Sequence, residues 1–558
     1  MLLAFFASTG LAQADLVSLP EDVMIVLPLL PEADVTFPQP LPALAVAPLT
    51  LEPVPEVPPL LLAAPLNEAV RQWLETRVHE DAQRHSASAF AGPGIQRKER
   101  EAILAFYAAR QFAPLWVEQG GFTAAAGGVL ARLEHAGDDG LDLQLTPVPV
   151  LAAGAGASQM VQAEVALSEA IVAYGRQASG VRVDPQRISA LISAKPAIAD
   201  AARILGRIGG AGLEAGNVLQ AFNPPQKAYA RLRDKLQEVR REQRPVASLI
   251  APGPVVRLGM RDPRVPLIRA RFGLDTVTAP DPADLTYDTR VANAVADFQR
   301  ANGLPASGIL TARTIAALSG GKPSLLENEI LANMERWRWM PRDMGQRRIE
   351  VNVPDFTVRL LDGETVLHSA RVVVGKPATP TPIFSNSMQF LIVNPYWNVP
   401  QSIIKKEMMP KLAADPGYLQ RLGYEVIQRG NSLVVRQPPG ERNALGRIKF
   451  MFPNDHAVYL HDTPSRALFA NSFRAYSHGC VRVDQPFKLA EAVLGAGWNE
   501  ARVRSLIGGP ERKIDLPQAL PIHIEYFTAT VDDSGRLQLR DDIYGYSRRL
   551  KLEMGLAD

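Results

Sequence analysis

Apolar residues recur with a helical period along the first half of the chain. Between about residues 66 and 250 they fall three and four positions apart, as in Ile103, Leu104, Phe106 and Tyr107 and in Val129, Leu130 and Leu133. Such spacing places one apolar stripe on each helix. Glycines and Pro114 interrupt the pattern at intervals. It predicts a mainly helical domain over residues 67–250.

A shorter helical pattern lies between residues 255 and 320. Its first helix is predicted from an N-cap at Asp262 followed by Pro263, with Gly273 at its end. The later helices carry apolar faces at Val291, Val295 and Phe298 and at Ile315 and Leu318, with Gly303 ending the second and Thr311 capping the third. These signals predict a compact unit of three helices.

From about residue 345 the period changes to that of β-strands. Short β-rich runs separated by Pro, Gly, Asn and Asp occupy Arg348–Val353, Thr357–Leu361, Val366–Val374, Gln389–Asn394 and Val458–His461. A largely helical insert, from Gln401 to about Tyr418, interrupts them. The pattern predicts a β-rich domain of about 200 residues at the expected scale of a single domain.

The N-terminus has a short apolar run, Leu2 to Leu11, followed by Ala12-Gln13-Ala14. The run is shorter than a membrane span, and the small residues resemble a cleavage site, so residues 1–14 are interpreted as an export signal. No Lys or Arg precedes the run. One alternative is a frayed terminus without a targeting role. Another is a membrane tether, if the true start of the chain lies upstream.

Prolines recur every few residues between Pro20 and Pro65. Because proline fixes φ and removes a hydrogen-bond donor, residues 15–66 are predicted to be an extended linker. The segment could hold a folded body away from a membrane or be a leader without such a role, and the sequence does not distinguish these.

Charge and cysteine content exclude several classes of function. The formal net charge of +2 is spread over 558 residues without a basic run, which argues against nucleic acid as a partner. A single cysteine, Cys480, precludes an intramolecular disulfide and a cysteine-based metal site. His79, His85 and His135 lack ligand partners at metal-binding spacing and are interpreted as structural or surface residues.

The segment from Tyr459 to Val483 holds the candidate chemistry. A lone cysteine is usually a small buried hydrophobe, but Cys480 has one histidine nineteen positions earlier, His461, and another two positions earlier, His478. Either histidine could supply a base or a stabilising cation for a thiolate. Gly479 permits a tight turn that aims backbone N–H groups at an oxyanion.

Strand alternation distributes these side chains between two faces. Val458 and Leu460 are expected in the core, which leaves Tyr459 and His461 together on the opposite face. After the cysteine, alternation returns Arg482 to the Cys480 side, where a guanidinium suits a substrate carboxylate. Asp484 and Pro486 are then predicted to open a helix through Leu489 and Val493.

Several sequence motifs in this chain resemble those of one enzyme family. Ser-His-Gly-Cys-Val-Arg, preceded by His-Asp-Thr-Pro, resembles the active-site motif of the YkuD-type L,D-transpeptidases. Segments similar to the large Gram-negative members of that family are Phe106–Val117, Asn394–Ile403, Asn443–Asn454 and Asp541–Gly545. Ala294–Leu318 resembles a three-helix peptidoglycan-binding domain. The resemblance covers roughly residues 95–550.

The resemblance implies a multidomain α+β fold. The chain is expected to begin with a helical scaffold over 67–250, followed by a peptidoglycan-binding domain over 255–320. A β-rich YkuD-like catalytic domain comes next, over 327–531, and its helical lid insert spans about 401–445. Residues 532–558 form a C-terminal segment. Lys405, Lys406 and the methionines of the insert are expected to form one solvated and one packed helix face, whereas the lid role follows from the resemblance alone.

The resemblance also implies residue roles. Cys480 matches the nucleophile, His461 the general base, and His478 with Gly479 the pair flanking the nucleophile. Family members often orient the base with a backbone carbonyl, which fits Asp462 pointing to the opposite face. The expected substrate-binding residues are Arg482, Tyr459, Trp397 and Ser477. Core packing is the alternative for Tyr459 and Trp397, and ordering of the loop is the alternative for His478.

The implied reaction is acyl transfer between peptidoglycan stems through a thioester on Cys480, with release of terminal D-Ala. The acceptor is a second stem, a lysine of an envelope protein, or water. An L,D-carboxypeptidase, a wall–protein amidase and an inactive peptidoglycan-binding protein remain alternatives, and a cytosolic cysteine protease is less favoured. A periplasmic monomer without metal or organic cofactor is expected, and the family implies acylation by carbapenems.

Overall fold

A computed structural model describes residues 64–83, 96–118, 121–144, 146, 148–152, 154–243, 250, 253–274, 285–301, 306–311, 314–315, 318, 325–429 and 432–556. The predicted export signal and all but the end of the predicted linker lie outside these residues. The chain forms two compact units. The first comprises Ala370–Thr381 and Met388–Ala519, and the remaining described residues belong to the second.

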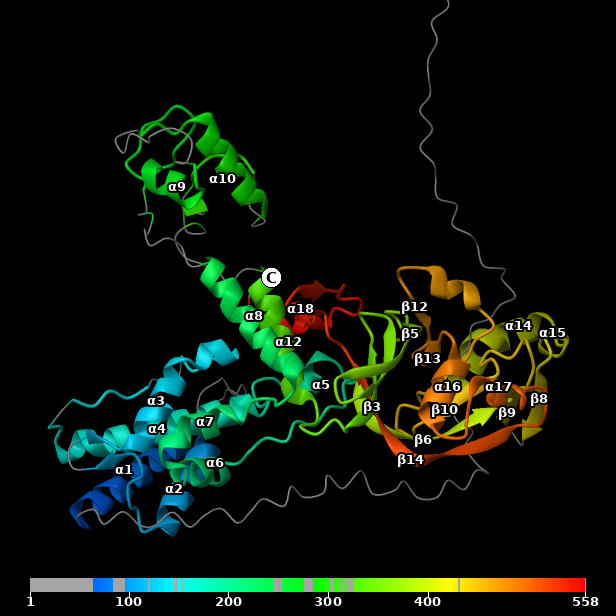
Figure 1. The fold of residues 1–558 in the computed structure, drawn as a ribbon, viewed down its shortest axis with the longest axis horizontal. Coiled ribbons are helices and arrows are strands. Elements are labelled where there is room, and N and C mark those ends of the chain that lie inside the picture. The colour runs from blue at the N-terminus through cyan, green and yellow to red at the C-terminus, as the bar shows by residue number, and fades with distance from the viewer. Residues whose placement is uncertain are drawn as a thin grey trace, which may run out of the picture. The chain divides into compact units, whose positions relative to one another are not determined.

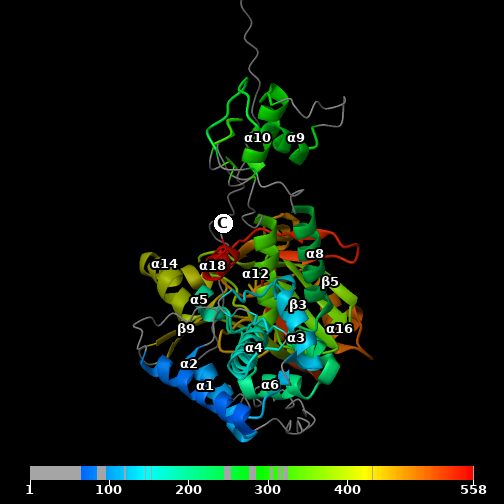
Figure 2. The same ribbon diagram turned by 90° about the vertical axis from the view of Figure 1, so that its left-hand side faces the viewer.

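The N-terminal half of the second unit is helical, as predicted. Its helices are α1 (Ala64–Gln83), α2 (Arg97–Ala109), α3 (Ala124–Glu134), α4 (Ala157–Ala178), α5 (Pro185–Ile188), α6 (Ala201–Gly209), α7 (Ala215–Gln220) and α8 (Lys227–Gln243). A further helix of this unit, α12 (Leu325–Trp339), lies beyond the predicted helical domain and was not predicted. Thr123 and Asp200 cap α3 and α6 by accepting backbone N–H groups of the first turn. Helices α1 and α2 lie side by side (Figures 1 and 2).

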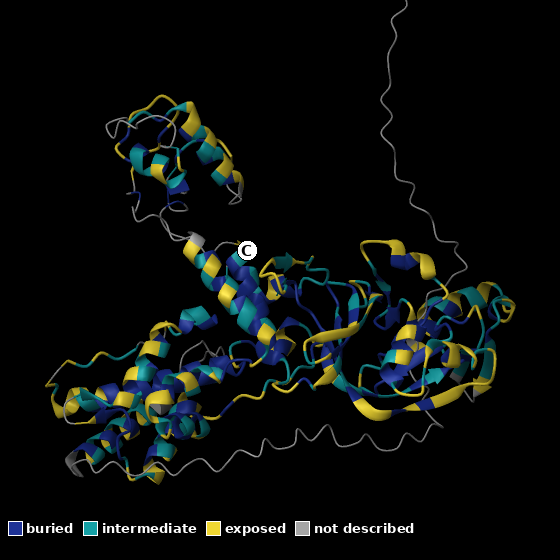
Figure 3. Cartoon of the chain, viewed as in Figure 1, coloured by how far each residue is buried: buried dark blue, intermediate teal, exposed yellow. Residues whose placement is uncertain are grey.

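Helix α4 forms the centre of this helical core. Figure 3 shows it buried along much of its length. Its Glu164 carboxylate accepts the backbone N–H groups of Leu115, Trp116 and Val117 at 2.7, 2.8 and 3.1 Å. The Tyr107 hydroxyl donates to the same carboxylate at 2.5 Å. A buried acidic group therefore ties the segment after α2 to α4, and every oxygen of the carboxylate is satisfied.

The predicted three-helix unit has its own apolar core of Ile250, Val256, Val265, Ile268, Tyr287, Val291, Val295, Leu310, Ile315 and Leu318. Its first helix, α9 (Val265–Arg271), begins later than the sequence predicts. Asp262 instead accepts the Arg264 N–H in a preceding turn, because Pro266 occupies the first helical turn. Asp288 caps α10 (Thr289–Ala301) by accepting the Val291 N–H at 2.9 Å.

The first unit contains the strands that carry the candidate motif. They pair in the order β12-β5-β13-β11-β10-β6. Their bounds are β5 Thr365–Gly375, β6 Phe384–Val393, β10 Ile448–Met451, β11 Leu460–His461, β12 Ala475–Ser477 and β13 Val481–Val483. Helix α16 (Pro486–Leu494) follows β13 as predicted, and α17 (Glu500–Arg504) comes next.

The insert is helical at its start and continues as a hairpin. It runs through α13 (Gln401–Ile403), a π-helical segment η3 (Ile404–Met408), α14 (Met409–Ala414) and α15 (Tyr418–Arg421) to the paired strands β8 (Glu425–Arg429) and β9 (Ser432–Gln437). Strand β9 also pairs with β7 (Trp397–Asn398). Lys405 and Lys406 are exposed and Met408 is buried, but Met409 is 46% exposed, so only one of the two methionines follows the predicted packed face.

The second unit also contains β-structure. Strand β3 (Arg347–Asn352) lies between β4 (Thr357–Asp362) and the C-terminal part of β14 (Arg512–Glu525), antiparallel to the first and parallel to the second. Strands β15 (Ala529–Val531) and β16 (Leu537–Leu539) and helix α18 (Tyr546–Glu553) follow. Among the described helices, none is long and apolar enough to cross a bilayer.

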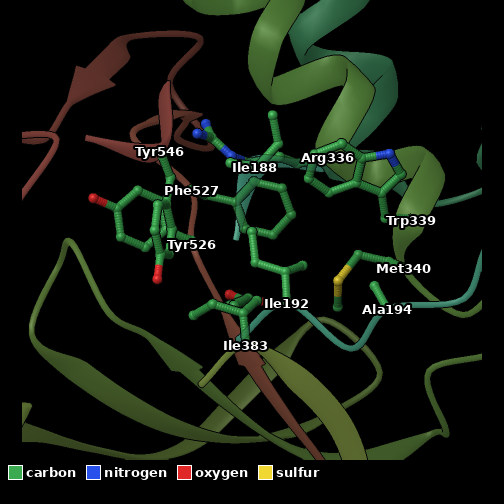
Figure 4. A pocket seen from close by; sticks show the side chains of 11 residues that line it. Ile188, Ile192, Ala194, Arg336, Trp339, Met340, Ile383, Tyr526, Phe527 and Tyr546 are labelled. Atoms are coloured by element: carbon green, nitrogen blue, oxygen red, sulfur yellow. The ribbon is translucent and has the colours of Figure 1, made fainter. Parts of the chain in front are cut away.

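An apolar pocket in the second unit is lined by side chains from α12, the 188–194 segment and the 525–527 segment (Figure 4). Its volume is about 30 Å³. Room of that size accommodates little more than a water molecule. None of the side chains that line the pocket belongs to the segment from Tyr459 to Val483.

Candidate active site

Cys480 stands in a tight loop between β12 and β13. The Ser477 hydroxyl donates to the Cys480 carbonyl at 2.6 Å and accepts the Gly479 N–H at 3.1 Å. Gly479 has φ +129°, a backbone conformation that side chains disfavour. The Thr381 hydroxyl donates to the Gly479 carbonyl at 2.8 Å. The loop is thus fixed from both sides, and among the described residues the Cys480 N–H donates no hydrogen bond.

His461 lies on β11 next to the strand that follows Cys480, since it pairs with Arg482 across the β11–β13 ladder. Its Nδ1 is 2.5 Å from the Asp462 carbonyl oxygen. Because a carbonyl can only accept, Nδ1 carries the proton and Nε2 holds a lone pair. Nε2 is buried without a hydrogen-bond partner among the described residues. This is the tautomer that a general base requires.

Burial and neighbouring cations keep this imidazole neutral. Burial is the largest cause that lowers the pKa of His461 to about 3, and the charge of Arg482 adds to it. The Asp462 side chain does not face the ring: it accepts the Arg447 N–H at 2.8 Å and pairs with Arg466. The His461 ring is therefore oriented by a backbone carbonyl and not by a carboxylate.

Burial also controls the thiol. Cys480 is 2% exposed, and burial raises its pKa to about 11 against the opposing effects of the Tyr459 backbone, Lys449 and Arg482. Its Sγ lies 4.0 Å from the Ala457 carbonyl oxygen. Asn454 shapes this turn, since its side-chain oxygen accepts the Val458 N–H at 3.2 Å. The thiol is therefore protonated and the imidazole neutral in the resting site.

Arg482 brings an unsatisfied guanidinium to the same site. It is 3% exposed, and its Nε and Nη1 have no hydrogen-bond partner among the described residues. Burial lowers its pKa to about 10, so the group is still a cation at neutral pH. A buried cation without a counter-ion is costly, and a carboxylate would satisfy both its charge and its fork of donors.

The other residues predicted to bind substrate, Tyr459, Trp397 and Ser477, are all buried. Tyr459 is buried with its ring centroid 5.7 Å from that of His461, so the predicted shared face is present. Trp397 is fully buried against Tyr424 in the insert, which is core packing. Ser477 is fully buried, and both of its hydrogen bonds lie inside the loop. The contacts of Trp397 and Ser477 described here are packing and loop hydrogen bonds, and the substrate-binding role expected of them stays a prediction.

His478 points to the insert. Its Nε2 lies 3.3 Å from the Glu407 carboxylate on η3, while its Nδ1 is buried without a partner among the described residues. Burial lowers the pKa of His478, the charge of Lys376 adds to this, and Glu407 opposes it. The contact supports the loop-ordering interpretation, because it joins the loop that carries Cys480 to the insert.

Sequence reasoning did not single out Lys449, Glu407, Asn454 or Thr381. Both Asn454 and Lys449 lie within the segment Asn443–Asn454. Strand pairing with His461 brings Lys449 to the site, whereas Asn454 acts through its side-chain hydrogen bonds to the backbone of Val458. Glu407 and Thr381 lie in segments without a motif of their own. Among the described residues, no group of three or more His, Cys, Asp and Glu side chains is placed to hold a metal ion.

Comparison with family models gives three matches along the chain. Residues 346–508 match the YkuD family, described as "L,D-transpeptidase catalytic domain". Residues 101–236 match a family described as "Scaffold domain". Residues 270–318 match one described as "Putative peptidoglycan binding domain". The YkuD match contains Cys480, His461 and Arg482.

Similar proteins carry the same description. A protein of Haemophilus influenzae named "Putative L,D-transpeptidase" is 34% identical over 251 residues, which are 41% of this chain and 50% of that protein. The chain thus spans about half the length of this curated relative. A solved L,D-transpeptidase of Xylanimonas cellulosilytica is 16% identical, with 49% of this chain and 100% of that chain covered and a TM-score of 0.16.

A mutant L,D-transpeptidase of Enterococcus faecium is 13% identical, with 32% of this chain and 50% of that chain covered and a TM-score of 0.16. The family models, and not these distant structural likenesses, identify the domains. The chain carries a YkuD-family L,D-transpeptidase catalytic domain together with a scaffold domain and a peptidoglycan-binding domain.

Proposed function

We propose that this protein is an exported L,D-transpeptidase that joins peptidoglycan stem peptides through a thioester on Cys480. The observation that carries the proposal is the combination of one cysteine, a neutral histidine with a free Nε2, and an arginine without a counter-ion in one buried site. Nucleophile, base and carboxylate receptor are the parts that acyl transfer from a peptide with a free carboxyl end requires.

In the first step the Cys480 sulfur attacks the carbonyl carbon of diaminopimelate, the third residue of a tetrapeptide stem. His461 Nε2 takes the thiol proton as the S–C bond forms, and the free Cys480 N–H donates to the oxyanion. Collapse breaks the C–N bond to the terminal D-Ala. The departing amine takes the proton from His461, which leaves a thioester and a neutral imidazole.

In the second step an amine from another stem attacks the thioester carbonyl. It loses a proton to His461, the C–S bond breaks, and the sulfur recovers the proton. The products are a new amide and the free thiol, so no other reactant is needed. Water in place of the amine would make the same site an L,D-carboxypeptidase, and a protein lysine would make it an attachment enzyme.

Substrate binding itself strengthens the base. Arg482 is the second cause, after burial, that lowers the pKa of His461. A D-Ala carboxylate bound to the guanidinium would neutralise that effect, so the affinity of His461 for the thiol proton rises when substrate occupies the site. Proton transfer from the thiol to His461 is thus assisted at the imidazole when substrate is bound.

Mass spectrometry of products from purified tetrapeptide stems tests the proposal. We expect a dimer linked through the third residues and free D-Ala with the wild-type protein, and neither product with Cys480→Ala or Cys480→Ser, because a serine hydroxyl is far harder to deprotonate. Trimmed monomer alone would assign a carboxypeptidase. Turnover above a few per cent in either variant would exclude Cys480 as the nucleophile.

Acylation by a β-lactam provides an independent measure of the same thiol. A strained lactam carbonyl offers Cys480 the same acyl chemistry, so one carbapenem should add to each chain on the peptide that contains Cys480.

Export is tested separately, by fractionation of cells that express the full chain. Recovery of the mature protein outside the cytoplasm supports it, and retention in the cytoplasm contradicts it.

A further inference from the structure

Three side chains lie in one row across adjacent strands of the active site. Lys449 on β10 pairs with His461 on β11, and His461 pairs with Arg482 on β13. Directly paired residues of neighbouring strands project from the same face of a sheet. The imidazole of the base therefore lies between two basic side chains, one on each neighbouring strand.

Lys449 is buried in this row without a counter-ion. It is 7% exposed, and its Nζ lies 4.2 Å from the ring centroid of Tyr459, within cation–π range. In the described part of the chain no carboxylate forms an ion pair with it, although Glu511 lies near enough to act on its charge. The Glu511 carboxylate instead accepts the Tyr396 N–H at 2.6 Å.

The titratable groups around the thiol give this ammonium a role. Cys480 interacts with Lys449 from β10, with Tyr459 and with Arg482. Lys449 in turn interacts with Cys480 and Glu511, and it acts on His461. Burial lowers the pKa of Lys449 to about 8, and negative charge on the sulfur opposes that shift. A thiolate and this ammonium thus stabilise each other.

An imidazolium is a poor counter-ion at this position. A proton on His461 would lie between Lys449 and Arg482, and both cations lower its pKa. If Arg482 binds the substrate carboxylate, as the proposed function requires, its charge is compensated by the substrate. Lys449 is then the remaining cation of the row that can offset negative charge on the sulfur.

We propose that Lys449 is a further functional residue of this site, whose ammonium, held against the Tyr459 ring, stabilises the Cys480 thiolate during acyl transfer. The inference rests on the proposed function for its place in catalysis. The stabilisation itself needs no substrate, because it concerns the sulfur and the ammonium alone. It can therefore be measured on the free protein.

The experiment measures the rate of Cys480 alkylation by iodoacetamide between pH 6 and 10. The chain has a single cysteine, so the rate reports this thiol alone. We expect Lys449→Met to lower the rate about tenfold between pH 6 and 8, where the wild-type side chain is an ammonium, since loss of one nearby charge corresponds to about one pKa unit of the thiol. The difference should shrink above pH 8, as the wild-type lysine loses its proton. Lys449→Arg, which keeps the charge, should restore most of the rate.

Lys513→Met is the matched control. Lys513 also places its Nζ over an aromatic ring of the same unit, 4.5 Å from the centroid of Phe390, but it is 54% exposed. The Lys513→Met substitution removes a cation–π contact but no charge that acts on the thiol. Alkylation of Cys480 should therefore proceed at the wild-type rate. Thermal unfolding of all three variants identifies any that fail to fold.

Two results would overturn the inference. A wild-type alkylation rate in Lys449→Met would show that the ammonium does not act on the thiol. Equal slowing in folded Lys449→Met and Lys449→Arg would assign the effect to packing and not to charge. Neither result depends on peptidoglycan, so they leave the proposed function intact. Conversely, a chain without transpeptidase activity that still shows the tenfold effect would refute only the proposed function.

Discussion

At the scale of single residues, the two histidines near Cys480 differ in what their ring nitrogens contact. His461 Nδ1 is bound to a carbonyl and its Nε2 is free, whereas His478 Nε2 faces Glu407. We expect His461→Gln to lower kcat/KM by about 10²–10⁴-fold, the usual contribution of a general base. His478→Gln should cost less than tenfold. Steady-state rates on stem peptides check both, and the reverse order would exchange their roles.

Burial of His461 also predicts how stability depends on pH. Its pKa is about 3 in the folded chain, below the ordinary value of 6.5. Between these values the unfolded chain binds a proton that the folded chain does not, so stability falls as the pH drops from about 6.5 toward 3. Urea unfolding at pH 7 and pH 4.5 should show this loss, and His461→Gln should reduce it. An equal loss in the variant would contradict the shift.

Strand alternation and motif order suffice to predict some of the site. Alternation places Tyr459 with His461 and Arg482 with Cys480, and the resemblance to the family motif joins these pairs into one site. The position of Lys449 beside His461 could not be predicted in this way, because it depends on the register between β10 and β11. For Ser477 the sequence predicts the position in the motif but not the hydrogen bond. The structure shows that its hydroxyl donates to the Cys480 carbonyl within the same loop.

At the scale of secondary-structure elements, the insert contacts the loop that carries Cys480 through His478 Nε2, which lies 3.3 Å from the Glu407 carboxylate. Glu407 lies on the π-helical segment η3, a type of segment that often occurs at functional sites. We expect Glu407→Gln to raise hydrogen exchange in residues 401–414 about two- to fivefold at pH 6, as suits a pair that is partly exposed. Glu441→Gln is the control, because Glu441 is in the insert but 89% exposed. Unchanged exchange would show that His478 does not hold the insert.

The helical scaffold depends on a different buried acid. Glu164→Gln would turn amide N–H groups toward the backbone donors of Leu115, Trp116 and Val117, so at least one buried donor loses its acceptor. We expect a loss of roughly 2–4 kcal/mol in the stability of this region. Hydrogen exchange of the peptide containing Trp116 measures it. Glu101→Gln, at a side chain that is 45% exposed, should leave that exchange unchanged.

Elements were predictable where their apolar period is unbroken. The helices between residues 97 and 243 and strands β3, β4 and β5 follow their patterns closely. The long strand β14 was not predicted, because Pro517 and Pro521 interrupt it and prolines argue against a strand. Helix α9 begins at Val265 and not near Pro263, since Pro266 fits the first turn as well as Pro263 does.

At the scale of the whole molecule, the chain is built from modules whose cores are separate. The apolar core of the three-helix unit draws all its residues from between Ile250 and Leu318. The helical scaffold has another core, which ends at Phe222. A change of period along the sequence predicts that the modules bury their own apolar residues. The first compact unit, Ala370–Thr381 with Met388–Ala519, is smaller than the catalytic domain predicted over 327–531, because the strand-rich segments at both ends of that range belong to the second unit.

Separate cores predict that one module can be removed without unfolding the others. Deletion of residues 255–320 removes nearly the whole core of the three-helix unit and exposes no other core. We expect the truncated protein to bind purified sacculi several-fold more weakly than the full chain, while turnover of a soluble tetrapeptide stays within about twofold. Sedimentation with sacculi and a soluble-peptide assay measure the two effects on the same preparations. Equal sedimentation of both proteins would show that this unit is not what attaches the enzyme to the wall. Loss of soluble turnover together with sacculus binding would show that the modules depend on one another for folding, contrary to their separate cores.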